Sequence, residues 1–232
     1  MKKIIIVTSL LLIGMSAFAG EAWKNHVGFG LRLPTGMSAD ISNKNTEWEL
    51  KMPVQTGIDL TYTGVHMKTG FSVRGFMDYN LSSSNITAMN PNNTDLYGLN
   101  IDAGVGAGWA PIRNKFLLLG LYGVLGLDMS YFPDAAADIK LDSTTTIANT
   151  AMYTYGTAFV GGNATLVWTP LGGRFSIFGS ATAAYNLPSI FSVEYETRYE
   201  YARDTQKTTK ADRFDVSPAV KIIPTIGLSW RF

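Results

Sequence analysis

Cysteine is missing from this sequence of 232 residues, and histidine occurs only twice. Stability therefore has to come without disulfide bonds. A metal site, which usually needs three or four ligands, is not expected, and neither is another cofactor. The charges are few and balanced, with 19 Lys and Arg against 18 Asp and Glu. Because binding to nucleic acid requires a basic surface, this balance argues against nucleic acid as a partner.

The N-terminus has the pattern of a secretory signal peptide. Lys2 and Lys3 precede an apolar run from Ile4 to Ile13, and the small-residue motif Ala17-Phe18-Ala19 follows. We expect residues 1–19 to be cleaved and residues 20–232 to form one domain. The run is short for a spanning helix, so an uncleaved anchor is the less favoured alternative. No later run reaches the roughly 18 apolar residues that a spanning helix needs, whereas a closed barrel of strands could still cross a membrane.

Beyond residue 20 the apolar residues recur with a period of two, which is typical of strands. Eight such segments lie near residues 27–33, 58–62, 71–79, 97–109, 116–130, 160–168, 175–186 and 220–232. We expect each of them to give a strand of about nine to thirteen residues, and a strand that crosses a membrane at a tilt needs about 9 to 11. The sequence therefore predicts strands long enough to span a bilayer.

The expected connections alternate between long and short. Long ones lie near residues 34–53, 80–95, 132–150 and 188–215, and short ones near 63–66, 111–115 and 169–174. Short periplasmic turns and long outer loops are typical of outer-membrane barrels. We therefore predict an all-β fold: a transmembrane, antiparallel, up-and-down β-barrel of eight strands.

Tryptophan gives independent support for this topology. Four tryptophans fall at the periplasmic ends of the expected strands, and they are Trp23, Trp109, Trp168 and Trp230. Because the indole ring prefers the membrane interface, we predict that these four form a periplasmic aromatic girdle. Trp48 falls in an expected long loop. A soluble β-sandwich, the alternative, gives no reason for tryptophan to gather at one end.

The polar face of the strands would line the barrel lumen. The predicted lumen charge network consists of Arg32, Asp59, Arg74, Asp78, Asp102, Asp128, Lys221 and Arg231. An eight-stranded barrel is only wide enough for side chains to fill, and an unpaired buried charge is costly. We expect a paired, hydrogen-bonded core, with a narrow gated path for a small solute as the alternative. Pro224 cannot donate to a ladder and should mark a bulge or a weak point in the last strand.

The final residues, GLSWRF, resemble the C-terminal signal of bacterial outer-membrane β-barrel proteins. In that class a final aromatic residue, here Phe232, follows apolar residues at alternating positions, here Leu228 and Trp230. The resemblance implies that the barrel assembly machinery is a partner. It also implies export through the Sec pathway to the bacterial outer membrane, with outer-membrane lipid around the barrel.

In length and loop pattern the chain is similar to OmpW-like and OmpX-like proteins. OmpW-like proteins are associated with the passage of small hydrophobic molecules, and OmpX-like proteins with surface contacts. The resemblance therefore implies a narrow passage for small molecules, hydrophobic ones included. The alternative is a non-conducting surface barrel or adhesin that binds a host or surface ligand through its long outer loops.

Two further patterns bear on function. His26 and His66 fall at the expected periplasmic side, away from the outer leaflet where a lipid A-modifying barrel would need a histidine and a serine, so we predict no enzyme. Residues 192–203, SVEYETRYEYAR, alternate as well and predict an exposed hairpin that returns through residues 207–214. Its face with Tyr195, Tyr199 and Tyr201 would contact a partner, or the hairpin would only shield the barrel mouth.

Overall fold

The computed structural model describes residues 22–43, 46–86, 96–135, 139–140, 146–201 and 204–232, so the expected signal peptide lies outside the described residues. The strands are β1 (Trp23–Asn43), β2 (Thr46–His66), β3 (Phe71–Ile86), β4 (Leu96–Arg113), β5 (Leu117–Ala135), β6 (Ile139–Lys140), β7 (Thr146–Trp168), β8 (Phe175–Asn186), β9 (Ser189–Tyr201), β10 (Asp204–Val216) and β11 (Ala219–Arg231). A short 3-10 helix, Pro170–Gly172, joins β7 to β8. In this described part of the chain no helix has the length and apolar character to cross a membrane.

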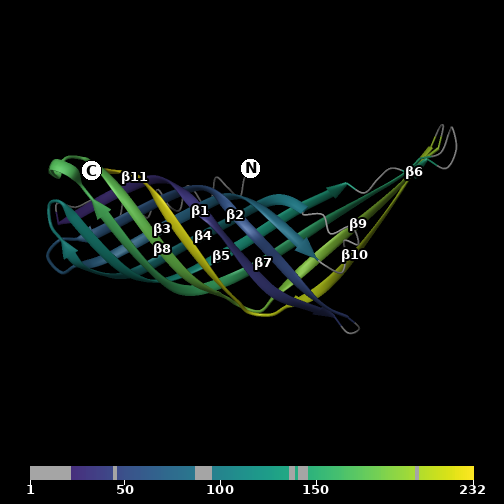
Figure 1. Ribbon diagram of the computed structural model, residues 1–232, viewed down its shortest axis with the longest axis horizontal. Helices are drawn as coiled ribbons and strands as arrows, with labels where there is room; N and C mark the ends of the chain where they lie inside the picture. The colour runs from purple at the N-terminus through teal and green to yellow at the C-terminus, as the bar shows by residue number, and fades with distance from the viewer. Residues whose placement is uncertain (1–21, 44–45, 87–95, 136–138, 141–145, 202–203) are drawn as a thin grey trace.

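Eight strands close into a barrel (Figure 1). Around the ring, β1 to β5 follow in chain order, then come β7, β8 and β11, and β11 pairs with β1. Every pairing is antiparallel, and the pairing of β11 with β1 closes the ring. The predicted all-β, eight-stranded antiparallel barrel is confirmed.

The strands are longer than the sequence suggested. β1 and β2 have 21 residues each and β7 has 23, because the ladders continue into stretches that were expected to be long loops. Trp48, for example, lies in β2 opposite Ile41 of β1. The expected loops near residues 34–53, 132–150 and 188–215 are therefore wrong over most of their length. Short connections do occur at the other end, and the first of them begins after His66 because β2 extends to that residue.

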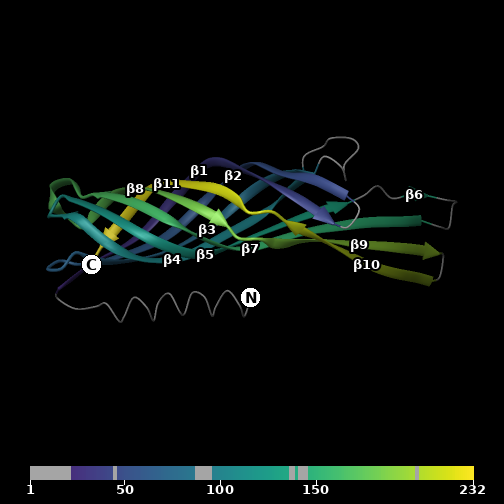
Figure 2. The same cartoon turned by 90° about the horizontal axis from the view of Figure 1, so that it is seen from below.

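β9 and β10 continue the barrel wall beyond β8 and β11. Asn186 of β8 lies opposite Ala219 of β11, and Ser189 of β9 lies opposite Val216 of β10 in the same register. The hairpin extends past the ends of most other strands (Figure 2). The sequence predicted a hairpin from residues 192–203, and the backbone of β9 and β10 forms it. The side chains of Tyr195, Tyr199 and Tyr201 lie outside the described part of the structure.

Side chains alternate between the two faces of the wall. Leu125 of β5 and Leu228 of β11 point outward and are 61% and 58% exposed, and their neighbours Val124 and Ser229 are buried inside. A belt of exposed leucine, valine, isoleucine and aromatic residues is the reverse of a water-soluble surface and is typical of a barrel that faces lipid.

Candidate functional site: a charged layer below an apolar layer

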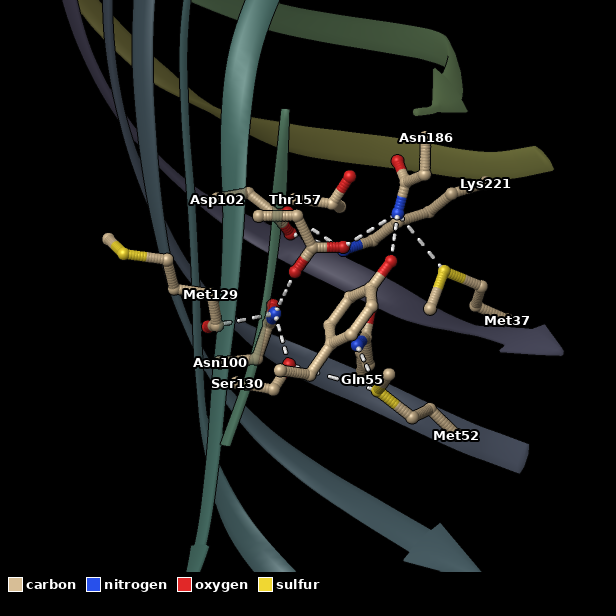
Figure 3. A network of polar contacts seen from close by, with 12 residues as sticks. Met37, Met52, Gln55, Asn100, Asp102, Met129, Ser130, Thr157, Asn186 and Lys221 are labelled. Carbon is tan, nitrogen blue, oxygen red and sulfur yellow. Dashed lines mark hydrogen bonds and ion pairs between the residues drawn. The ribbon is translucent and has the colours of Figure 1, made fainter. Parts of the chain in front are cut away.

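Four charged residues span the lumen at one height, and we call Arg32, Asp102, Asp128 and Lys221 the charged layer. Lys221 Nζ on β11 lies 2.7 and 2.9 Å from the two carboxylate oxygens of Asp102 on β4 (Figure 3). It also lies 2.8 Å from Asp128 Oδ2 on β5. Arg32 of β1 binds Asp102 directly. All four side chains have zero exposure, so opposite walls of the barrel are joined by buried ion pairs.

Amide side chains complete the hydrogen bonding of the charged layer. Asn100 Nδ2 donates to Asp128 Oδ1 at 2.6 Å, and Asn186 Nδ2 donates to Asp128 Oδ2 at 3.1 Å. Gln55 Oε1 accepts from Arg32 Nη2 at 2.9 Å. The sequence reasoning missed these amides as members of the network. Their signal was present, because Asn100 precedes Asp102 by two positions and therefore faces the same side of its strand.

The other predicted network residues do not join these ion pairs. Asp59 and Asp78 extend the row of aspartates onto β2 and β3, since Asp59 lies opposite Asp78 and Asp78 opposite Asp102. Arg74 Nη2 donates to Ser180 Oγ at 3.1 Å, and among the described residues it forms no ion pair. Arg231 was wrongly placed in the network. It lies at the far end of β11, where its Nη2 donates to the carbonyl of Gly172 at 2.9 Å.

An apolar layer fills the lumen on the outer side of the charged layer. Its members are Met37, Ala39, Ile41, Leu50, Met52, Phe132, Tyr153, Tyr155, Phe191, Val193, Phe214, Val216 and Ala219. The rings of Tyr153 and Phe191 stack with centroids 6.1 Å apart. Gln55 and Asn186 donate to the sulfurs of Met52 and Met37 at 3.4 and 3.2 Å, so the two layers are in direct contact (Figure 3).

The expectation of a lumen lined by polar residues is therefore wrong at this height. The strands here extend beyond the lipid-facing belt, where the outer face carries polar residues such as Asp40 and Glu49 and the apolar residues turn inward. A barrel end surrounded by water follows the rule of soluble proteins, with its apolar side chains in the interior.

The wall beside the apolar layer contains an unpaired stretch, which we call the seam. β1 pairs with β11 as far as Arg32, opposite Thr225, and pairs again with β10 from Ile41, opposite Val216. No residue of 33–39 is paired with a residue of 218–224. Against β2, the same part of β1 has register shifts on both sides of Thr35. The stretch from Leu33 to Gly36 is therefore weakly held on both sides, whereas Met37 to Ala39 stay paired with β2.

Prolines account for much of the seam. Pro34, Pro218 and Pro224 all lie in it, and none has an N–H to donate to a ladder. The expected bulge at Pro224 is wrong for the β8–β11 ladder, where Pro224 lies opposite Ala181 without a register shift. The weak point is instead on the β1 side, because the β1–β11 ladder stops at Thr225, directly beside Pro224.

On the outer surface, an apolar groove adjoins the seam. It has a volume of about 630 Å³ and runs from Leu33 and Pro34 across β2 and β3 to Leu99 of β4. Ala39 and Ala219 belong to the two edges of the seam, and their buried side chains are part of the apolar layer inside the barrel. The seam therefore borders an apolar interior, and its β1 edge also forms one end of the apolar outer groove.

The lumen below the charged layer is also filled. Phe76 and Phe159 stack with centroids 6.4 Å apart and pack with Tyr122, Val124 and Ala184. A further buried cluster lies towards the short turns, formed by Val65, Ala110, Leu118, Val167 and Phe178. Buried side chains therefore occupy the axis of the barrel at each of these heights.

The four predicted girdle tryptophans lie at the end with the short turns. Trp109, Trp168 and Trp230 are exposed on the outer wall, and Trp230 packs edge-on against Phe175 with centroids 4.7 Å apart. Trp23 packs edge-on against His66 at 5.4 Å.

The remaining sequence-predicted positions lie at the same end. Leu228 and Phe232 are exposed on or just after β11, and His26 lies near the start of β1. Reading of the C-terminal segment by the assembly machinery and the absence of catalysis both stay predictions.

No protein-family model and no curated protein matches the sequence. A major outer membrane protein from Thermus thermophilus matches in structure, with 13% identity, a TM-score of 0.56, and coverage of 91% of this chain and 100% of that chain. The protease OmpT from Escherichia coli matches at 10% identity and a TM-score of 0.35, covering 90% and 97%. The P. putida toluene transporter TodX matches at 8% and 0.25, covering 93% and 91%. The first similarity shows that the chain has the fold of an outer-membrane β-barrel.

Proposed function

We propose that this outer-membrane barrel gives small apolar molecules a route between the cell exterior and the membrane, through the apolar layer and out by the seam. One observation carries the proposal: the unpaired stretch of wall lies directly beside the apolar layer, and its Leu33 and Pro34 form one end of the apolar groove on the outer surface. Polar solutes have no comparable path, because the charged layer and the clusters below it fill the lumen.

The charged layer explains why the route would leave sideways. A molecule moving along the axis would have to separate Lys221 from Asp102 and Asp128, and breaking a buried pair costs about 3–5 kcal/mol. An apolar molecule could not replace the lost hydrogen bonds. A lateral exit into hydrocarbon avoids this barrier.

The seam is also the part of the wall that opens at least cost. Separating two paired strands breaks ladder hydrogen bonds, each of which contributes about 0.5–1.5 kcal/mol. Between residues 33–39 and 218–224 there are no paired residues to separate. Met37, which lies in the seam and belongs to the apolar layer, has a flexible side chain that can repack around a guest molecule.

The uptake of N-phenyl-1-naphthylamine tests the proposal. This apolar dye fluoresces when it reaches membrane hydrocarbon, and cells that express the protein should take it up faster than cells without it. Ala219→Phe fills the apolar layer behind the seam and should return uptake to the background rate. Ala183→Phe is the matched control, because Ala183 points outward on β8, which is paired on both sides, and it should keep the wild-type rate.

Two results would contradict this function. One is equal dye uptake with and without the protein, and the other is wild-type uptake by Ala219→Phe when its heat-dependent gel mobility shift shows a folded barrel. Planar bilayers provide a separate check, since a filled lumen should give no steady ion conductance. Regular conductance steps would instead indicate a channel for polar solutes.

The hairpin β9–β10 favours a second candidate, a surface protein that acts through its outer end. Its two strands of 13 residues each stay paired from Val216 and Ser189 outward to the tip. Val193 lies opposite Asp212, so joining these two residues by a two-residue turn removes the outer part of the hairpin. Under the proposed passage, the shortened protein keeps its dye uptake. Loss of cell adhesion without any effect on dye uptake would favour the surface role.

A further inference from the structure

The end of the barrel with the short turns is rich in basic side chains. Residues 22–26, 63–72, 110–118, 169–177 and 229–232 contain no aspartate or glutamate. They contain the basic residues Lys24, Lys68, Arg113, Lys115, Arg174 and Arg231. Within the described part of the chain, none of these six forms an ion pair. By contrast, the outer end has both signs, as in the pair of Lys51 and Glu49 at 2.9 Å.

Two of these cations, Lys115 and Arg231, contact the turn between β7 and β8, which leads directly into Arg174. Arg231 Nη2 donates to the carbonyl of Gly172 at 2.9 Å, and its backbone N–H donates to the carbonyl of Arg174 at 2.8 Å. The side chain of Lys115, from the neighbouring turn, lies against Gly172, where it occupies the space that a Cβ would need. Gly172 has a φ of +62°, which favours glycine at this position for a second reason.

Aromatic rings surround this group of cations. Lys115 Nζ lies 5.7 Å from the ring centroid of Phe116, and Arg174 directly precedes Phe175, which packs on Trp230. Tryptophan on the outer wall, here Trp230, marks the level of the lipid headgroups in a membrane protein. The positive charge therefore lies where a barrel meets the phosphates of the surrounding leaflet.

We propose that Lys115, Arg174 and Arg231 bind the headgroup phosphate of an anionic glycerophospholipid in the periplasmic leaflet. Arginine and lysine are the usual ligands of phosphate, and no acidic side chain among the described residues of this rim competes for them. The acyl chains would lie along the exposed face of Phe175 and Trp230. The aromatic border favours a lipid over a soluble periplasmic anion, because it provides an apolar surface for the chains.

Quenching of tryptophan fluorescence by brominated lipid measures this preference. The purified protein is inserted into phosphatidylcholine vesicles that contain increasing fractions of brominated phosphatidylglycerol or, in parallel, brominated phosphatidylcholine. The wild type should bind phosphatidylglycerol several-fold more strongly, and the preference should fall at high salt. In the double variant Lys115→Gln/Arg174→Gln the preference should largely disappear, because each basic residue at an anionic surface contributes up to roughly fivefold.

The control removes the same charge from the outer end. Lys51→Gln/Arg213→Gln changes two exposed residues far from the β7–β8 turn and should keep the wild-type preference. Equal quenching of the wild type by the two lipids would overturn the proposal, and so would an unchanged preference in the Lys115/Arg174 variant. If millimolar glycerol phosphate abolished the preference, the site would belong to a soluble anion, which would also overturn it.

Discussion

Removing the central cation of the charged layer should destabilise the barrel strongly. Lys221 makes three contacts of 2.7, 2.9 and 2.8 Å with two aspartates, and the side chains have zero exposure. Lys221→Met preserves the length of the side chain but leaves Asp128 without a cation, whereas Asp102 keeps Arg32. Loss of one partner from a buried pair costs about 3–5 kcal/mol, and we expect the lower end of that range because Asn100 still donates to Asp128.

The free energy of unfolding in urea, followed by tryptophan fluorescence in lipid vesicles, measures this loss. Lys51→Met is the matched control, since Lys51 pairs with Glu49 at 2.9 Å with side chains 52% and 43% exposed, and its loss should cost about 0–1 kcal/mol. Adding Asp128→Asn to Lys221→Met removes the stranded charge and should recover at least half of the stability. A loss below about 1 kcal/mol for Lys221→Met would refute the buried ion-pair reasoning.

Two further substitutions have effects with a known sign. Gly126→Ala should destabilise the barrel by about 1–3 kcal/mol, because the new Cβ would overlap the buried ring of Phe159, whereas Gly123→Ala on the same strand meets no atom within 4 Å and should be neutral in the same unfolding assay. Hydrogen bonding from Lys51 lowers the pKa of Glu49. This favourable interaction is present at neutral pH and is lost as the pH falls through the pKa of Glu49. The substitution Lys51→Gln should therefore raise the pKa of Glu49, which a titration of its carboxyl ¹³C chemical shift measures.

The membrane-crossing part of the fold was predictable because lipid imposes a single rule on it. Residues such as Leu125 and Leu127 must be apolar where they face hydrocarbon, and this produces a regular period of two. Above the lipid belt the rule reverses, and Met37, Ala39 and Ile41 face inward. The period of two persists in these outer parts of the strands. Because their outer face is polar, however, their composition is that of a loop, and they were expected to be loops.

For the charged layer, the sequence predicts which residues face the lumen but not which of them lie at the same height. Alternation tells which face of a strand a residue occupies, and in this respect Lys221 and Arg231 are equivalent. It does not give the height in the barrel, and ten residues of strand separate these two by about 33 Å. Height depends on the stagger between strands, which brings Lys221 beside Asp102 over 119 positions of sequence.

The same limit applied to the seam. Pro224 signalled a break in a ladder, but only the pairing of β11 with both neighbours shows that the break lies towards β1 and not towards β8.

Spin labels on the outer wall test the orientation of the barrel most directly. The chain has no cysteine, so Leu125→Cys on β5 and Leu228→Cys on β11 each provide a single attachment point in a well-separated part of the ring. In bilayers, both labels should collide freely with dissolved oxygen and only rarely with a water-soluble nickel complex. Frequent collisions with nickel and few with oxygen at these two sites would show that the apolar face does not contact lipid.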